Sequence, residues 1–210
     1  MNCSYRKGNV MKNHGVYAPR AVVLARNIRA IVFDSDGVLT DNTESVGYGS
    51  DVIVKKRSHY DGQGISLLRA IGLHVAVITG ETGAGATLIE HLVRRWNTLP
   101  STKSKSNPNG WESISLYTGC RDIQKRDALN GWLTQIGVSH EECAVMGDDL
   151  VDVSMLNAVT FRAAPASAED VIREMVEFVS ARTGGNGAVR DLANFILESR
   201  GLNPFDYPTS

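Results

Sequence analysis

The chain has 210 residues, and its 22 Lys and Arg against 23 Asp and Glu give a formal net charge of −1. That length suits one domain with a full hydrophobic core. The charge balance leaves no broad basic field, so we expect no nucleic-acid partner. No apolar run approaches the roughly 18–20 residues that span a bilayer, so we expect no membrane partner. The 3 cysteines fit neither a zinc site nor a disulfide framework, which favours reduced thiols and a cytoplasmic protein.

The elements predicted along the chain alternate between strands and helices. Residues 1–27 are polar and are expected to form an N-terminal tail, and residues 201–210 a C-terminal tail. Continuous apolar runs predict strands at residues 30–33, 75–78, 114–117, 143–146 and 159–163. Amphipathic patterns predict helices from Asp61 to Gly72 and over residues 87–96, 127–136, 150–156, 168–176 and 188–197. This alternation predicts an α/β domain over residues 28–200, with a parallel sheet and helices on both faces.

Two segments interrupt the alternation. Residues 40–60 are rich in Gly, Ser, Val and Lys and are predicted to form a β-hairpin flap, with residues 52–54 as one arm. Residues 97–110 are dense in Ser, Asn and Pro, which predicts a loop or a disordered insertion. No linker is long enough to separate two domains, so we expect no separate cap domain.

Polar residues follow the ends of three predicted strands. The first strand passes into Asp34-Ser35-Asp36-Gly37, the second into Thr79-Gly80, and the fourth into Gly147-Asp148-Asp149, with Asp152 close behind. Ligands of open α/β sheets bind beyond the carboxyl ends of the strands, so these side chains should converge on one crevice. Crowded carboxylates repel one another, and a bound cation relieves the repulsion. Because only oxygen ligands are on offer, the cluster predicts Mg²⁺ and a phosphate that shares the metal.

The pair Asp34 and Asp36 suits phosphoryl transfer. One carboxylate can attack phosphorus and form an aspartyl-phosphate, and the second can protonate the leaving oxygen and then deprotonate the attacking water. Thr79 supplies a hydroxyl for the phosphoryl oxygens, and a lysine or arginine at another strand end must supply positive charge. Lys125, just before a predicted helix, is the best placed. Lys55, Lys56 and Arg126 could supply the charge instead.

Four segments, taken in order, resemble the motifs of the haloacid dehalogenase (HAD) superfamily. They are Phe33-Asp34-Ser35-Asp36-Gly37-Val38-Leu39-Thr40-Asp41, Ile78-Thr79-Gly80, Lys125 and Gly147-Asp148-Asp149-Leu150-Val151-Asp152. The resemblance implies a HAD-like Rossmannoid sheet and a phosphoric monoester hydrolase that uses Mg²⁺. It implies that the catalytic residues are Asp34, Asp36, Thr79 and Lys125. It also implies that Asp34, the Asp36 carbonyl and Asp148 hold the metal, with Asp149 and Asp152 behind them.

A closer resemblance is to small phosphatases without a cap domain that act on 3-deoxy-D-manno-octulosonate 8-phosphate (KDO 8-phosphate). It rests on the predicted flap, on Asp61-Gly62-Gln63-Gly64-Ile65 and on Gly184-Gly185-Asn186-Gly187-Ala188-Val189-Arg190. The resemblance implies a small phosphorylated sugar acid as the partner. It also implies a homotetramer, in which Arg190 acts in its own or a neighbouring subunit. The residues implied to contact the substrate are Asp61, Gly80, Glu81 and Arg190.

The chain departs from that group at two places. Glu81 follows Thr79-Gly80, where the KDO 8-phosphate enzymes usually carry a basic residue. The second departure is the insertion at residues 97–110, together with a slightly longer spacing from Gly119 to Lys125. An acidic residue after Thr79-Gly80 resembles relatives that act on nine-carbon sugars, such as 2-keto-3-deoxynonulosonate 9-phosphate or a sialic acid 9-phosphate. It also resembles the phosphatase-like domain of CMP-sialic acid synthetases. An alternative function is therefore a non-enzymatic tetramerisation module of sugar-nucleotide synthesis.

Several of these side chains also suit purely structural roles. Asp61 suits the N-cap of its helix, and Asp149 and Asp152 suit a helix N-terminus. Arg190 could pair with Asp191 or Glu198 at the surface.

Overall fold

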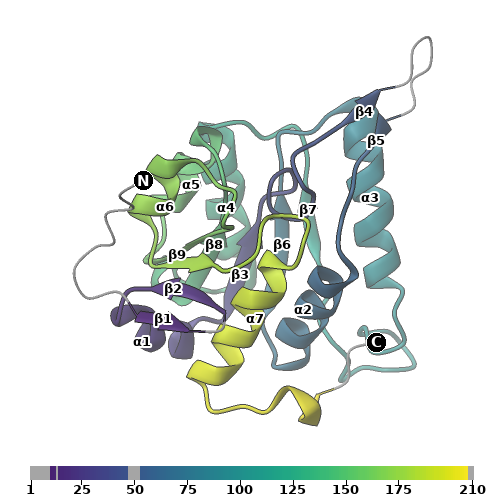
Figure 1. Ribbon diagram of the computed structural model, residues 1–210. Coiled ribbons are helices and arrows are strands. Elements are labelled where there is room, and N and C mark those ends of the chain that lie inside the picture. The colour runs from purple at the N-terminus through teal and green to yellow at the C-terminus, as the bar shows by residue number, and fades with distance from the viewer. Residues whose placement is uncertain (1–9, 13, 47–52, 208–210) are drawn as a thin grey trace.

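The computed structural model describes residues 10–12, 14–46 and 53–207 of the chain. Its main sheet holds 8 strands in the order β1-β2-β10-β9-β8-β3-β6-β7 (Figure 1). The strands are β1 (Val10–Lys12), β2 (Gly15–Tyr17), β3 (Ala30–Phe33), β6 (His74–Ile78), β7 (Ser115–Tyr117), β8 (Cys143–Met146), β9 (Phe161–Ala164) and β10 (Phe178–Ser180). The pairs from β10 through to β7 are parallel, whereas β1–β2 and β2–β10 are antiparallel. The predicted α/β fold with a mostly parallel sheet is confirmed.

Helices cover both faces of this sheet. They are α1 (Arg20–Asn27), α2 (His59–Ala70), α3 (Gly83–Asn97), α4 (Ile123–Ile136), α5 (Val153–Leu156), α6 (Asp170–Met175) and α7 (Ala188–Ser199). Ile31 and Phe33 of β3 pack in the core that residues of α1, α2, α3 and α7 share, while Ala30 and Val32 pack in the core that residues of α4, α5 and α6 share. Burial on both faces explains why the central strands read as continuous apolar runs. None of the helices in the described ranges is long and apolar enough to cross a membrane.

The predicted N-terminal tail is wrong for the described part of residues 1–27. β1 and β2 extend the sheet beyond β10, and α1 buries Ala21 and Ala25 completely. The ring of Tyr17 lies 4.7 Å from the ring of Phe195 in α7. Strands of 3 residues are too short to show a period in the sequence, which is why the pattern does not predict this part. The domain therefore includes the chain from Val10 onward rather than from residue 28.

The predicted flap is present as a short antiparallel pair, β4 (Ser45–Val46) with β5 (Ile53–Val54). Residues 47–52 of the predicted hairpin, including Val52, lie outside the described residues, whereas residues 40–44 and 55–58 are not in strands and residues 59–60 begin α2. Within the described residues, this pair and α2 are the elements between β3 and β6, so no cap domain interrupts the fold there. The predicted C-terminal tail contains a short 3-10 helix at Pro204–Asp206, and residues 208–210 lie outside the described residues.

The segment 97–110 forms a loop, as predicted, and a buried arginine holds it. Arg69 of α2 donates to the Trp96 and Glu112 carbonyl oxygens at 3.1 and 3.0 Å. It also donates to the hydroxyl of Thr102 at 3.0 Å, and both side chains are buried. Burial lowers the pKa of Arg69 to about 10. Within the described residues, no carboxylate is among the hydrogen-bond partners of Arg69. Its guanidinium N–H groups donate to neutral oxygens instead.

The contact between α2 and α7 corrects the role predicted for Asp61. The N-cap of α2 is Ser58, whose hydroxyl accepts the N–H of Tyr60 at 3.1 Å. Asp61 instead serves the start of α7, because its carboxylate accepts the N–H groups of Gly187 at 3.0 Å and Arg190 at 3.2 Å. The two helices approach closely at Gly64, where a Cβ would lie 2.9 Å from the Arg190 Cα. Asp61 is therefore a cap across two helices rather than the cap of its own.

Candidate active site

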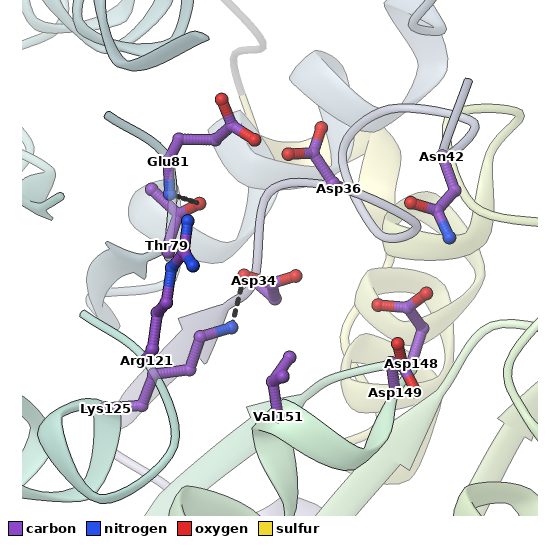
Figure 2. Close-up of a pocket in the computed structure, with 11 residues that line it drawn as sticks. Asp34, Asp36, Asn42, Thr79, Glu81, Arg121, Lys125, Asp148, Asp149 and Val151 are labelled. Atoms are coloured by element: carbon purple, nitrogen blue, oxygen red, sulfur yellow. Dashed lines mark hydrogen bonds and ion pairs between the residues drawn. The ribbon is translucent and has the colours of Figure 1, made fainter. Parts of the chain in front are cut away.

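The carboxyl ends of β3, β6 and β8, which are neighbours in the sheet, open into one cavity of about 250 Å³ (Figure 2). The cavity brings together most of the residues that the sequence predicts for the site. Its lining residues are Asp34, Asp36, Asn42, Thr79, Gly80, Glu81, Arg121, Lys125, Asp148, Asp149 and Val151. Asp152 lies directly behind this lining, in contact with Lys125 and with the backbone of Asp148.

Asp34 lies directly after β3, 5% exposed, and a buried lysine holds its carboxylate. Lys125 of α4 is 1% exposed and donates to Asp34 Oδ1 at 2.7 Å and to Asp152 Oδ1 at 2.6 Å. Burial and the Asp152 charge raise the pKa of Asp34 to about 7, against the attraction of Lys125. Burial lowers the pKa of Lys125, but the two carboxylates outweigh it, so the pKa is raised. Lys125 therefore stays charged beside Asp34.

The carboxylates at this edge of the sheet suit a divalent cation. One oxygen each from Asp34, Asp148 and Asp152 lie within 4.8 Å of one another. Burial and the charges of Asp34 and Asp152 raise the pKa of Asp148 to about 8. Asp152 is already engaged, since Oδ1 binds Lys125 and Oδ2 accepts the N–H of Asp148 at 2.9 Å. Oδ2 of Asp34 and the Asp148 carboxylate therefore remain for a hard cation, and Asp152 positions the groups around them.

The acids after β8 also cap the short helix that follows them. The Asp149 carboxylate accepts the N–H of Leu150 at 2.6 Å, at the start of a 3-10 turn over Leu150–Asp152. Oδ2 of Asp152 reaches back to the N–H of Asp149 at 3.4 Å. The sequence offered two roles for Asp149 and Asp152, at a helix N-terminus or behind the metal ligands. The structure shows the contacts of the first role.

Two glycines let the loop after β3 approach its neighbours. Gly37 has φ of 80°, and a Cβ there would lie 1.9 Å from Oδ2 of Asp148. A Cβ on Gly184 would lie 1.6 Å from the carbonyl oxygen of Gly37. Any side chain at either position would displace the loop that carries Asp34 and Asp36. The predicted glycine-rich segment before α7 therefore supports the site through the backbone.

Asp36 faces a cluster of charged side chains at the base of the flap. Lys55, directly after β5, donates to both Asp36 carboxylate oxygens at 2.8 Å and lies 3.1 Å from a carboxylate oxygen of Glu44 and of Glu81. The Thr40 hydroxyl donates to Asp36 at 2.8 Å. Burial raises the pKa of Asp36, but hydrogen bonds from Glu81, Lys55 and Thr40 outweigh it and the pKa is lowered. Burial and the hydrogen bond with Asp36 raise the pKa of Glu81.

Thr79 and Gly80 follow β6 at the side of the cavity. The Thr79 hydroxyl accepts the N–H of Glu81 at 3.1 Å, and Thr79 is 2% exposed. The N–H of Thr79 is used within the sheet, where it donates to the Tyr117 carbonyl oxygen at 2.9 Å. The hydroxyl hydrogen of Thr79 is therefore the group that this residue can donate to an anion in the cavity.

Two predicted substrate contacts lie away from the cavity lining. Asp61 is 2% exposed and bound to the start of α7. Arg190 donates from Nε to Asn194 Oδ1 at 3.0 Å and lies 3.5 Å from Gln63. Asp191, which the sequence offers as a partner for Arg190, pairs with Arg182 at 2.7 Å instead.

Sequence reasoning missed several residues that line or border the cavity. It does not predict Asn42, Arg121 or Val151, and it offers Lys55 only in place of Lys125. Arg121 lies between Gly119 and Lys125, the stretch whose spacing departs from the KDO 8-phosphate group, so that departure was the available signal for it. Lys56 and Arg126, which could also have supplied the positive charge, do not line the cavity.

The chain belongs to the haloacid dehalogenase-like hydrolase family, whose model matches residues 23–192. The family predicted from the four motifs is confirmed. The chain is a hydrolase.

Within this family, the chain is similar to phosphatases that are named for KDO 8-phosphate. The 3-deoxy-D-manno-octulosonate 8-phosphate phosphatase KdsC of Yersinia pestis is 32% identical over 184 residues, which cover 88% of this chain and 87% of the relative. A crystal structure of the Yersinia pestis phosphatase has a TM-score of 0.76 at 26% identity, covering 93% of this chain and 95% of that chain. The Moraxella catarrhalis phosphatase, solved in complex with magnesium ion, phosphate ion and a KDO molecule, has a TM-score of 0.72 at 23% identity, covering 87% of this chain and 92% of that chain. The predicted relationship to KDO 8-phosphate phosphatases is confirmed.

Proposed function

We propose that this enzyme is an Mg²⁺-dependent phosphatase that hydrolyses the terminal phosphate of KDO 8-phosphate. The observation that carries the proposal is the buried arrangement of Asp34, Lys125 and Asp148 at the ends of three adjacent strands. The sequence similarity to phosphatases named for KDO 8-phosphate supports this substrate. The oxygen-only donor set, with carboxylate pKa values raised by burial and by neighbouring carboxylates, fits Mg²⁺.

The chemistry that we propose uses side chains of this cavity. An Asp34 oxygen attacks phosphorus, the bond from phosphorus to the sugar oxygen breaks, and Asp36 gives that oxygen a proton. Water then attacks the phospho-Asp34 ester, Asp36 takes a proton from the water, and phosphate leaves. Lys55 and Thr40 favour the carboxylate form of Asp36, which the second step requires. The first step uses the protonated form of Asp36, and the proton taken from water in the second step regenerates that form.

The remaining groups hold the phosphoryl oxygens. Lys125 brings a buried positive charge next to Asp34, and Thr79 has a hydroxyl hydrogen to donate. Asp34, the Asp36 carbonyl and Asp148 would hold Mg²⁺, which neutralises phosphoryl charge when bound. Asp152 fixes Lys125 and the backbone of Asp148, so it acts as a positioning residue.

A second candidate substrate is a nonulosonate 9-phosphate. The acidic residue that favoured it, Glu81, lines the cavity, so it stands where it can influence substrate choice. Measuring kcat/KM for both esters under the same conditions decides between them. The homotetramer is part of the proposal for either substrate, and light scattering of the purified protein tests it.

Replacing Asp34 tests the mechanism. We expect Asp34→Asn to abolish phosphate release, by a factor of about 10³ or more, because the amide is not a nucleophile. Asp127→Asn, an exposed change on α4, should keep full activity. Thermal unfolding should show that both variants are folded. Phosphate release by Asp34→Asn at the wild-type rate would contradict the assignment of the nucleophile.

A further inference from the structure

The charge of the cavity poses a problem for an anionic substrate. The lining carries the carboxylates of Asp34, Asp36, Glu81, Asp148 and Asp149, and its basic residues are Lys125 and Arg121. A phosphate ester of a sugar acid brings two anionic groups into this field, the phosphate and the carboxylate. In the proposed function Mg²⁺ would neutralise phosphoryl charge, so the carboxylate is the group that still needs a positive partner that the protein does not already neutralise.

The lysines around the cavity are engaged by carboxylates. Lys125 is held between Asp34 and Asp152. Lys55 is held by Asp36 and lies within 3.1 Å of a Glu81 oxygen. These contacts fix both lysines close to the reacting carboxylates, where they serve the phosphoryl end of the substrate.

Arg121 differs from these lysines. Across the part of the chain that the structure describes, its guanidinium makes no hydrogen bond and no ion pair, although the residue lines the cavity and is exposed. Its stem packs over Gly80, where a Cβ would lie 3.2 Å from the Arg121 Cγ. Figure 2 shows the side chain extending beside Thr79, with the guanidinium turned toward the side of the cavity where Glu81 lies. Arg121 thus presents an available cation to the cavity.

The backbone that carries Arg121 is held in place. The N–H of Cys120 donates to the Thr79 carbonyl oxygen at 2.9 Å, and the N–H of Arg121 donates to Gln124 Oε1 at 3.1 Å. The next residue, Asp122, has φ of 44°, a conformation that costs a non-glycine residue about 1–3 kcal/mol. The Ser154 hydroxyl donates to the Asp122 carbonyl oxygen and helps to hold this turn. A strained turn fixed from two sides positions Arg121 without substrate.

Depth in the cavity separates the two anionic groups of the substrate. Asp34, the proposed nucleophile, is 5% exposed, so the phosphoryl group must bind at the floor. Arg121 lines the same cavity and is exposed, so a sugar body that extends from the floor toward solvent would pass it. We propose that Arg121 binds the carboxylate of the sugar acid and thereby selects acidic sugar phosphates over neutral ones. A guanidinium matches a carboxylate with two parallel hydrogen bonds. This inference rests on the proposed function.

The test compares two ligands that carry one anionic group each. Free KDO and inorganic phosphate are used as inhibitors of KDO 8-phosphate hydrolysis by wild type, Arg121→Ala and Arg121→Lys. We expect Arg121→Ala to raise KM about 10-fold, to leave kcat within about twofold, and to weaken inhibition by KDO about 10-fold. Inhibition by phosphate should not change. Arg121→Lys should lie between wild type and Arg121→Ala, because it keeps the charge and loses the paired geometry.

Arg126→Ala is the matched control, since Arg126 pairs with Asp127 outside the cavity lining. It should behave as wild type in every measurement. Unchanged inhibition by KDO in Arg121→Ala, or an equal loss of inhibition by phosphate, would overturn the inference while leaving the phosphatase intact. If wild type releases no phosphate from KDO 8-phosphate, the proposed substrate is wrong and the inference falls with it.

Discussion

Asp34, Asp148 and Asp152 face one another in a buried cluster beside Lys125. Burial, and the neighbouring carboxylates that one lysine does not neutralise, raise the pKa values of Asp34 and Asp148 to about 7 and about 8. The folded state therefore binds more protons than the unfolded chain between about pH 4 and pH 8. By linkage, the stability that these groups contribute without metal falls as the pH rises through that window. The repulsion among these carboxylates, which Mg²⁺ would relieve, thus lowers the stability of the metal-free protein.

Asp148→Asn should separate these two effects. Without Mg²⁺ at pH 8, we expect the variant to unfold at a Tm about 2–4 °C above wild type, equivalent to about 1 kcal/mol for a chain of this size. Added Mg²⁺ should raise the Tm of wild type and leave that of the variant unchanged, because one ligand is lost. Differential scanning fluorimetry with MgCl₂ or EDTA at pH 5 and pH 8 measures both. A wild-type response of the variant to Mg²⁺ would exclude Asp148 as a ligand.

Site residues that directly follow a buried strand could be predicted from the sequence. Asp34, Thr79 and Asp148 each follow an apolar strand closely, so their convergence follows from the parallel sheet. Arg121 could not be placed in the same way. Its position depends on the turn at Asp122, whose positive φ is uncommon for any residue other than glycine and is not signalled by the sequence.

At the scale of elements, the contact between α2 and α7 depends on Asp61. Its buried carboxylate caps α7, a helix whose own N-cap residue, Gly187, has no side chain to accept these N–H groups. Gly64 allows the helices to approach closely enough for this contact. The carboxylate therefore connects two helices that are distant in sequence.

Asp61→Ala should destabilise the fold by about 2–4 kcal/mol, because it leaves two buried N–H groups without an acceptor. Asp61→Asn keeps one acceptor oxygen and should lose about half as much. Urea unfolding measures both variants, with the exposed Asp127→Ala on α4 as the matched control. Equal stability of Asp61→Ala and wild type would show that water replaces the carboxylate at the start of α7.

The elements themselves were predictable where they are long or fully buried. The strand at Ala30–Phe33 and the helix that ends at Gly137 follow from an apolar run and from a helix stop signal, and Gly137 does adopt the left-handed conformation. The sequence pattern does not predict β10 or the pair β1–β2. These strands have 3 residues each and take their stability from pairing with one another and with β9.

At the scale of the whole molecule, Glu177, just before β10, connects the start of α1 to β9, two elements that are distant in sequence. Its carboxylate is 1% exposed, pairs with Arg162 at 2.7 Å and also binds Arg20 at the start of α1. Burial raises the pKa of Glu177, but the arginine contacts outweigh it and the pKa is lowered. A lowered carboxylate pKa contributes stability above the unfolded value of about 4.5, and this is lost as the pH falls through the folded value.

Glu177→Gln should therefore cost about 2–3 kcal/mol at pH 7, because charged hydrogen bonds to two arginines are replaced by neutral ones. The difference from wild type should shrink as the pH falls below about 4.5, because the unfolded chain then takes up a proton at Glu177 while the folded protein still holds the charge. Urea unfolding at pH 7 and at pH 4 measures the two differences. A difference that is the same at both pH values would show that packing, not charge, is the contribution of Glu177.

Gly184 lies against the carbonyl oxygen of Gly37, although the two are far apart in sequence. During synthesis, Asp34 leaves the ribosome long before Gly184 does. The loop that carries Asp34 therefore lacks its backbone support until most of the chain has emerged, and β2 likewise waits for β10. A nascent chain of this protein cannot complete its reacting site early, so partly synthesised chains should be inactive and dependent on protection from aggregation.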